Sequence, residues 1–242
     1  KLREMGSALV TLFGDPRNEI PLLAKKLSVD AVYCNRDYEP VSKERDETVY
    51  NQLKSLGITF QTFKDQVIFE GLEVATQSGS AYRKFTPYKN NWLKKLTDHD
   101  IINFQPKFVN LTPISRLRKL LNYLSLNNIG FKNRKSWLES GEEAAGNRLS
   151  VFLNNIDMYY KNRNLPAVDG TSGLSVHLRF GTISIRSLIR VIYKHKSKGA
   201  KLWLSELIWR DFYQMILDRY PVVVKQTFLP QFNQLKWSGT NS

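Results

Sequence analysis

Ala31-Val32-Tyr33-Cys34 is a short apolar run, and a polar stretch, Ser42 to Leu56, separates it from a second run, Ile58-Thr59-Phe60. Short apolar runs of this kind are typical of buried strands, whereas the polar stretch has the length of a helix and is closed by Gly57. Strands that alternate with helices favour a parallel sheet. This stretch therefore predicts an α/β fold for the first part of the chain.

The residues before this stretch extend the same pattern. Ala8 to Phe13 is another apolar run, ended by Gly14-Asp15-Pro16, and we expect a buried strand there. Asn18 to Leu27 has helical spacing. Three strands are few for a doubly wound sheet, so we expect an incomplete Rossmann-like parallel sheet over residues 1–61, with the start of the protein missing.

The rest of the chain divides into an irregular part and a helical part. Residues 62–139 contain Pro87, Pro106 and Pro113, and short helices are expected only at Tyr88–Leu96 and Ile114–Leu126. A connector this long is unusual unless it is functional. Residues 140–242 predict an all-α region, also incomplete, with helices over 142–161, 175–180, 184–196, 200–218 and 222–226.

Charge and composition limit the class of protein. The net charge is +14, and it is unevenly placed: about −2 over residues 1–82, +10 over 83–135 and +6 over 136–242. Such an excess indicates a polyanion partner such as DNA or RNA, or else a solvated basic face.

The one cysteine, Cys34, excludes an intramolecular disulfide framework and a multi-cysteine metal site. No run reaches the roughly 18 apolar residues of a membrane span, so we expect a soluble cytoplasmic protein.

The loop Asp169-Gly170-Thr171-Ser172-Gly173-Leu174-Ser175 leads into a helical pattern. Its glycines permit a close approach of the backbone, its hydroxyls are donors, and a helix N-terminus attracts anions. These features suit a phosphate or pyrophosphate site. An ordinary helix start with Ser175 as its N-cap explains the same residues.

A second pattern lies in Glu206-Leu207-Ile208-Trp209-Arg210-Asp211-Phe212-Tyr213. At helical spacing Glu206, Trp209, Arg210 and Tyr213 share one stripe, which could stack a base and pair with a phosphate. A helix with a Glu–Arg pair and aromatic core residues is the plainer interpretation.

Several motifs in order resemble the photolyase/cryptochrome family. In the helical part they are Leu165-Pro166, Asp169 to Ser175, Leu178-Arg179-Phe180-Gly181 and Glu206 to Tyr213. In the earlier parts they are Asp30 to Glu39, Arg45-Asp46, Phe63 to Phe69, Phe85 to Lys89 and Trp92-Leu93. The resemblance covers nearly the whole chain and is strongest to bacterial photolyases that repair cyclobutane pyrimidine dimers.

The resemblance implies a cofactor, reduced flavin adenine dinucleotide (FAD), and a DNA partner that carries a pyrimidine dimer. It implies FAD contacts for Tyr159, Thr171, Ser172, Gly173, Leu174, Ser175, Trp203 and Glu206. It implies DNA contacts for Arg163, Glu206, Trp209, Arg210 and Tyr213, with Trp209 stacking on a flipped base and Glu206 bonding a base edge. Lys84 and Lys89 are phosphate candidates from charge alone.

The implied reaction is light-driven splitting of the dimer by an electron from the excited flavin, with Glu206 and an electron-transfer tryptophan, Trp237, in catalytic roles. A folate antenna (methenyltetrahydrofolate) would lie near Glu39 and Lys225. A cryptochrome-type light receptor and a photolyase for six–four photoproducts are the alternatives. We expect residues 1–61 to end an antenna domain, 62–139 to connect, and 140–242 to begin the FAD domain of a monomer. Such a piece, lacking both ends, should be inactive alone.

Overall fold

The structure is a computed structural model, and it describes residues 1–104, 106–108, 110–121, 124–132 and 138–235. The chain forms two compact units, each built from separate stretches of sequence. The first comprises residues 1–33, 45–61 and 103–139, and the second comprises residues 34–44, 62–102 and 140–242.

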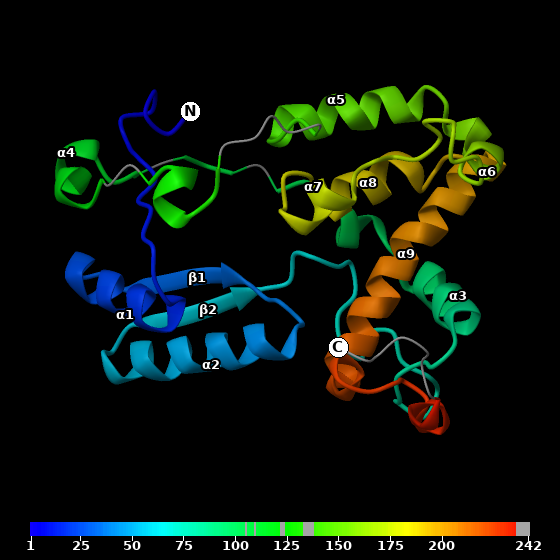
Figure 1. The fold of residues 1–242 in the computed structure, drawn as a ribbon, viewed down its shortest axis with the longest axis horizontal. Helices are drawn as coiled ribbons and strands as arrows, with labels where there is room; N and C mark the ends of the chain where they lie inside the picture. Colours follow the sequence, from blue (N-terminus) through cyan, green and yellow to red (C-terminus); the bar gives the residue numbers. More distant parts are fainter. Residues whose placement is uncertain (105, 109, 122–123, 133–137, 236–242) are drawn as a thin grey trace. The chain divides into compact units, whose positions relative to one another are not determined.

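A two-stranded parallel sheet lies beside two helices near the start of the chain (Figure 1). Its strands are β1 (Ala31–Asn35) and β2 (Thr59–Phe63), and the helices are α1 (Pro16–Leu27) and α2 (Pro40–Ser55). Ala24 of α1 meets Val49 and Leu53 of α2 in a small apolar core that also receives residues of both strands. The α/β fold expected from the sequence is confirmed.

The expected strand at Ala8–Phe13 is wrong. These residues are described and form neither helix nor strand, and the side chains of Leu9 and Phe13 are 72% and 71% exposed. A strand needs a neighbour for its backbone N–H and C=O groups, and the only sheet among the described residues pairs β1 with β2. Apolar residues without a pairing partner therefore stay in an extended loop.

Short helices complete the first unit. They are α4 (Ile114–Leu117) and the 3-10 turns η2 (Arg118–Leu120) and η3 (Leu126–Ile129). The single helix expected over Ile114–Leu126 is therefore too long. The start of the chain is tied to this region, since the Ser7 hydroxyl donates to the carbonyl of Thr112 at 2.7 Å and the Ile114 amide donates to the carbonyl of Gly6 at 2.9 Å.

The second unit is helical, as expected from the sequence. Its α-helices are α3 (Phe85–Lys95), α5 (Glu142–Leu153), α6 (Tyr159–Asn162), α7 (Ser175–Arg179), α8 (Ile185–Ile192) and α9 (Lys198–Arg219). The 3-10 turns are η1 (Asp98–Ile101), η4 (Ile156–Met158), η5 (Pro221–Val224) and η6 (Pro230–Gln234). The single helix expected over 142–161 is interrupted at Asn154-Asn155, between α5 and η4, and asparagine is a residue type that favours turns over helix interiors.

The long helix α9 forms the centre of this unit (Figure 1). It contacts α3, α6 and α8, and eleven of its residues are buried. Ser197 caps its start by accepting the amide of Ala200 at 3.2 Å. A helix that is apolar on most of its faces is a core helix, so α9 carries the aromatic and charged residues between Trp203 and Tyr213 on a rigid support.

No helix within the described residues is long and apolar enough to span a membrane.

Candidate functional site

The loop at 169–175 is held by one arginine of α5. Arg148 donates to the carbonyl oxygens of Thr171 and Ser172, at 2.8 and 2.9 Å, and pairs with both carboxylate oxygens of Asp169 at 2.6 and 2.7 Å. The pKa of Asp169 is lowered by its hydrogen bond with Arg148. In a trans peptide the N–H points opposite to the C=O. The amides of Ser172 and Gly173 therefore point away from Arg148.

These two amides donate to no acceptor among the described residues. Successive free amides make a concavity that attracts anions. Gly173 has φ +63°, a conformation that favours glycine, and a Cβ built there would lie 2.9 Å from Nε of Arg148. Leu174 is 1% exposed and fixes the loop to the core. The loop thus presents two backbone amides that have no acceptor among the described residues.

Ser175 does not cap the helix that follows. It is the first residue of α7, the N-cap is Leu174, and no side chain caps this helix. The plainer interpretation of the loop as a serine cap is therefore wrong. The hydroxyls of Thr171 and Ser175 make no hydrogen bond with other described residues, so they remain available to a ligand.

Tyr159 and Trp203 meet through a third ring. Phe152 of α5 packs edge-to-face against Tyr159, at 5.6 Å between centroids, and against Trp203, at 4.8 Å. Tyr159 is 7% exposed and Trp203 is 2% exposed. Burial raises the pKa of the Tyr159 hydroxyl, so this side chain stays neutral at physiological pH. In the sequence Phe152 stands on the apolar face of an expected helix, and that pattern assigned it no role in a site.

Arg163 and Glu206 form an ion pair beside this cluster. Their side-chain atoms Nη1 and Oε1 lie 2.5 Å apart, and the side chains are 30% and 34% exposed. The guanidinium also lies over the ring of Tyr159, at 5.4 Å from its centroid. The hydrogen bond with Glu206 raises the pKa of Arg163. Two residues expected to contact DNA thus neutralise each other in the free protein.

Trp209 belongs to an aromatic stack on α9. Its ring lies parallel to that of Phe85 at the start of α3, with centroids 3.6 Å apart and 8° between planes. It also stacks on Tyr213, with centroids 5.3 Å apart and 22° between planes. Tyr213 is 62% exposed. Phe85 belongs to the motif Phe85 to Lys89, but no local pattern in the sequence links it to Trp209, because the two residues lie far apart in the chain.

The side chain of Arg210 does not join the aromatic stack, although its helical spacing places it on the same stripe as Trp209 and Tyr213. Its guanidinium donates to the carbonyl oxygen of Gln66. It also lines a cavity of about 240 Å³ together with Arg179 and Asp65. Burial lowers the pKa of Arg210. The stripe therefore divides, with Trp209 and Tyr213 at one edge and Arg210 at the other.

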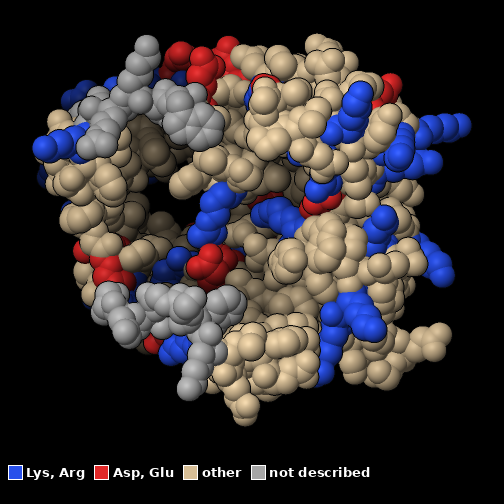
Figure 2. All heavy atoms as spheres, turned by 45° about the vertical axis from the view of Figure 1, so that its right-hand side comes forward, with Lys and Arg blue, Asp and Glu red and all other residues tan. Residues whose placement is uncertain are grey.

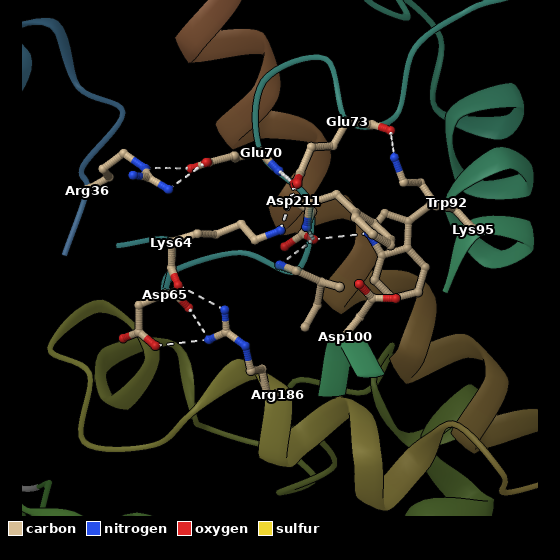
Figure 3. Close-up of polar contacts among 12 residues, drawn as sticks. Arg36, Lys64, Asp65, Glu70, Glu73, Trp92, Lys95, Asp100, Arg186 and Asp211 are labelled. Atoms are coloured by element: carbon tan, nitrogen blue, oxygen red, sulfur yellow. Dashed lines mark hydrogen bonds and ion pairs between the residues drawn. The ribbon is translucent and has the colours of Figure 1, made fainter. Parts of the chain in front are cut away.

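Asp211 connects α9 to two other segments (Figure 3). Its Oδ2 accepts the amides of Ile68 and Phe69, at 3.0 and 3.3 Å, and the indole N–H of Trp92 at 3.0 Å. The residue is 1% exposed, and burial raises its pKa to about 6. Its Oδ1 has no partner among the described residues. Sequence reasoning missed this role, since a buried acid in a helix resembles a surface acid until its neighbours are known.

Ion pairs brace the segment that leads from β2 to α3 (Figure 3). Arg36 binds Glu70 at 2.8 Å, and Arg186 binds Asp65 at 3.0 Å. The hydroxyl of Tyr38 also donates to Glu70, at 2.8 Å. These contacts hold residues 64–70 against α8 and against the loop between β1 and α2, and the carbonyl of Gln66 in this segment accepts the guanidinium of Arg210.

The remaining expected site residues lie apart from this group. Glu39 pairs with Arg179 at 3.2 Å, and Lys225 follows η5 on the surface. Lys84 precedes α3, and Lys89 lines a separate cavity with Lys201 and His195. Lys and Arg side chains are spread over the right-hand part of the face drawn in Figure 2. Trp237 lies outside the described residues.

The family model described as DNA photolyase matches residues 1–107. A deoxyribodipyrimidine photo-lyase of Synechococcus is 34% identical over 99% of this chain and 52% of its own length. One from Vibrio cholerae is 29% identical over 90% of this chain and 48% of its own length. An uncharacterised 31.6 kDa protein of another Synechococcus strain is 32% identical, with 76% of its length covered.

The chain belongs to the DNA photolyase family. It spans about half the length of the curated photolyases that it matches. Solved structures agree on the fold. A class III photolyase from Agrobacterium tumefaciens superimposes with a TM-score of 0.75 at 24% identity, covering 98% of this chain and 51% of that one. A cryptochrome from Synechocystis superimposes with a TM-score of 0.67 at 20% identity, and the match covers 90% of this chain and 48% of that one.

Proposed function

We propose that this chain is part of a photolyase that splits cyclobutane pyrimidine dimers in DNA by electron transfer from light-excited, reduced FAD. One observation carries the proposal. Helix α9 presents Trp203, Glu206 and Trp209 on successive turns, so the buried cluster at Tyr159 and the stack at Tyr213 are joined by one rigid element. The stretch from Trp203 to Trp209 spans about 9 Å of helix. A cofactor beside Trp203 and a flipped base on Trp209 would therefore lie next to each other.

The loop and the buried cluster support a site for FAD. The free amides of Ser172 and Gly173 suit its diphosphate, and the hydroxyls of Thr171 and Ser175 lie beside them. Tyr159 offers a neutral ring and hydroxyl at the start of α6, and Asn162 of the same helix lies against Gly170 of the loop. When bound, FAD supplies the absorption of blue light and the electron. The protein's part is to hold the flavin in place and to exclude water.

The other edge of α9 supports contact with DNA. Trp209 offers an indole on which a flipped base can stack. Arg163 supplies a cation, and Glu206 supplies a carboxylate that can bond to a base edge once its ion pair with Arg163 opens. Arg210 is a weaker candidate for a phosphate contact, because its guanidinium is largely desolvated and bonded to Gln66.

Three parts of the proposal rest on the family resemblance. These are the folate antenna near Glu39 and Lys225, the electron-transfer role of Trp237, and the division into antenna, connector and FAD parts at residues 61 and 139. The monomeric state, the cytoplasmic location and the inactivity of the 242 residues alone also stay predictions.

A repair assay tests the proposal. The intact protein, reduced and illuminated with blue light, should restore pyrimidines in an oligonucleotide with a cyclobutane dimer, and a dark sample serves as the control. A parallel substrate with a six–four photoproduct separates the two kinds of photolyase. Flavin absorption without repair of either substrate would favour the cryptochrome alternative. Absence of bound flavin would contradict both.

A further inference from the structure

Trp209 is the most fully stacked aromatic side chain of α9. Phe85 lies against it at 3.6 Å and almost parallel, and Tyr213 lies against it at 5.3 Å with a tilt of 22°. Phe85 and Tyr213 do not contact each other among the described ring pairs. Two rings that both stack on one indole without touching each other lie on its opposite faces.

The two neighbouring rings are held very differently. Phe85 is partly buried and packs on the core of the unit, with an edge contact to Phe212 at 5.9 Å. Tyr213 is 62% exposed, and its hydroxyl has no hydrogen-bond partner among the described residues. Its remaining ring contact is with Phe212 at 5.8 Å. The ring of Phe85 is therefore fixed, whereas that of Tyr213 can turn toward solvent by a change of rotamer.

We propose that Tyr213 occupies the place of the flipped base in the free protein and must leave the indole before Trp209 can stack on DNA. The inference rests on the proposed function, since it assumes that Trp209 receives a base. A flat base needs a free face of the indole. Because Phe85 holds one face, the face under Tyr213 is the one that a base can take.

The inference makes Tyr213 a competitor of the damaged base, so its removal should strengthen binding. Losing one stacked pair should tighten the binding of dimer-containing DNA by about two- to tenfold. Binding of undamaged duplex should stay the same, because it depends on contacts with phosphates rather than on a flipped base.

The experiment compares Tyr213→Ala with Tyr213→Phe in the intact protein, using fluorescence anisotropy of labelled duplexes with and without one thymine dimer. Tyr213→Phe keeps the ring that covers the indole, so it should not show the tighter binding that is expected of Tyr213→Ala. Tyr50→Ala, at an exposed tyrosine of α2, controls for the general loss of a surface ring. Tighter binding of the dimer by Tyr213→Ala alone supports the inference, and unchanged or weaker binding overturns it.

A measurement without DNA separates this inference from the proposed function. Acrylamide should quench the fluorescence of Trp209 more strongly in Tyr213→Ala than in the wild type, with Trp209→Phe used to subtract the other tryptophans. Equal quenching would mean that Tyr213 does not cover the indole. If quenching rises but the wild type shows no preference for the dimer, the proposed function fails while the covering of the indole stands.

Discussion

The carboxylate of Asp211 in α9 accepts the indole N–H of Trp92 in α3 at 3.0 Å, and Trp92 is fully buried. The same oxygen accepts two backbone amides, of Ile68 and Phe69. One buried oxygen therefore fixes the helix that carries Trp209 to the segment before α3 and to α3 itself.

Replacing Asp211 by leucine should strongly destabilise the protein. Leucine would leave three buried donors without an acceptor, each costing about 1–3 kcal/mol, so a total near 4 kcal/mol is expected. Urea unfolding followed by circular dichroism measures the change. Asp211→Asn is the matched control, since its amide oxygen can accept the same three donors, and it should lose much less. Equal losses for the two variants would show that these hydrogen bonds are not the cause.

The buried charge of Asp211 should make stability depend on pH. Burial raises its pKa from 3.8 to about 6. The folded protein then binds more protons than the unfolded chain between about pH 4 and 6, so this residue's contribution to the free energy of unfolding falls as the pH rises through that window. A rise of two units corresponds to about 3 kcal/mol. The difference between wild type and Asp211→Asn, measured from pH 4 to 7, should decrease accordingly; a flat difference would refute the shift.

Arg148→Met should weaken flavin binding at least tenfold. The guanidinium orients two carbonyls of the loop, and charge-assisted bonds of this kind are worth about 1.5–3 kcal/mol when shielded from water. Flavin fluorescence titration measures the affinity. Lys161→Met removes an exposed positive charge from the neighbouring α6 and should leave the affinity unchanged. A similar loss in both variants would indicate a general effect of charge.

Two glycine substitutions should change stability in opposite directions. In Gly173→Ala the alanine must adopt φ +63°, and its Cβ would lie too close to the side chain of Arg148. The substitution should therefore lower the free energy of unfolding by about 1–2 kcal/mol. Gly146→Ala, in α5 with open space around it, should raise it by about 0.5–1 kcal/mol. Thermal unfolding of both variants checks the pair. A neutral Gly173→Ala would mean that the loop tolerates another conformation.

Glu206→Gln should separate function from stability. Its ion pair with Arg163 is about one-third exposed, so its loss should cost less than about 1 kcal/mol of stability. Binding of dimer-containing DNA and the repair yield should fall, because the amide no longer supplies a carboxylate to the base. Repair at the wild-type level would exclude a direct role for this residue.

Local patterns in the sequence were sufficient for much of the fold. The apolar runs that form β1 and β2, the polar helix α2 between them, and the ordered motifs from Asp169 to Tyr213 all depend on neighbours in the chain. Patterns failed where long-range pairing decides the outcome. Ala8–Phe13 has the composition of a strand but no described partner strand, and the helix expected over Ile114–Leu126 ends after one turn.

The sequence alone determined which residue types stand at helical spacing on α9, because a helix is defined by contacts within four residues. The tertiary structure decided what each of them faces. Arg210 donates to the carbonyl of Gln66, and Asp211 is a buried acceptor for the indole of Trp92. Trp209 stacks on Phe85, which belongs to another helix. These contacts join residues more than 100 positions apart, so their strength comes from burial and packing that no local pattern contains.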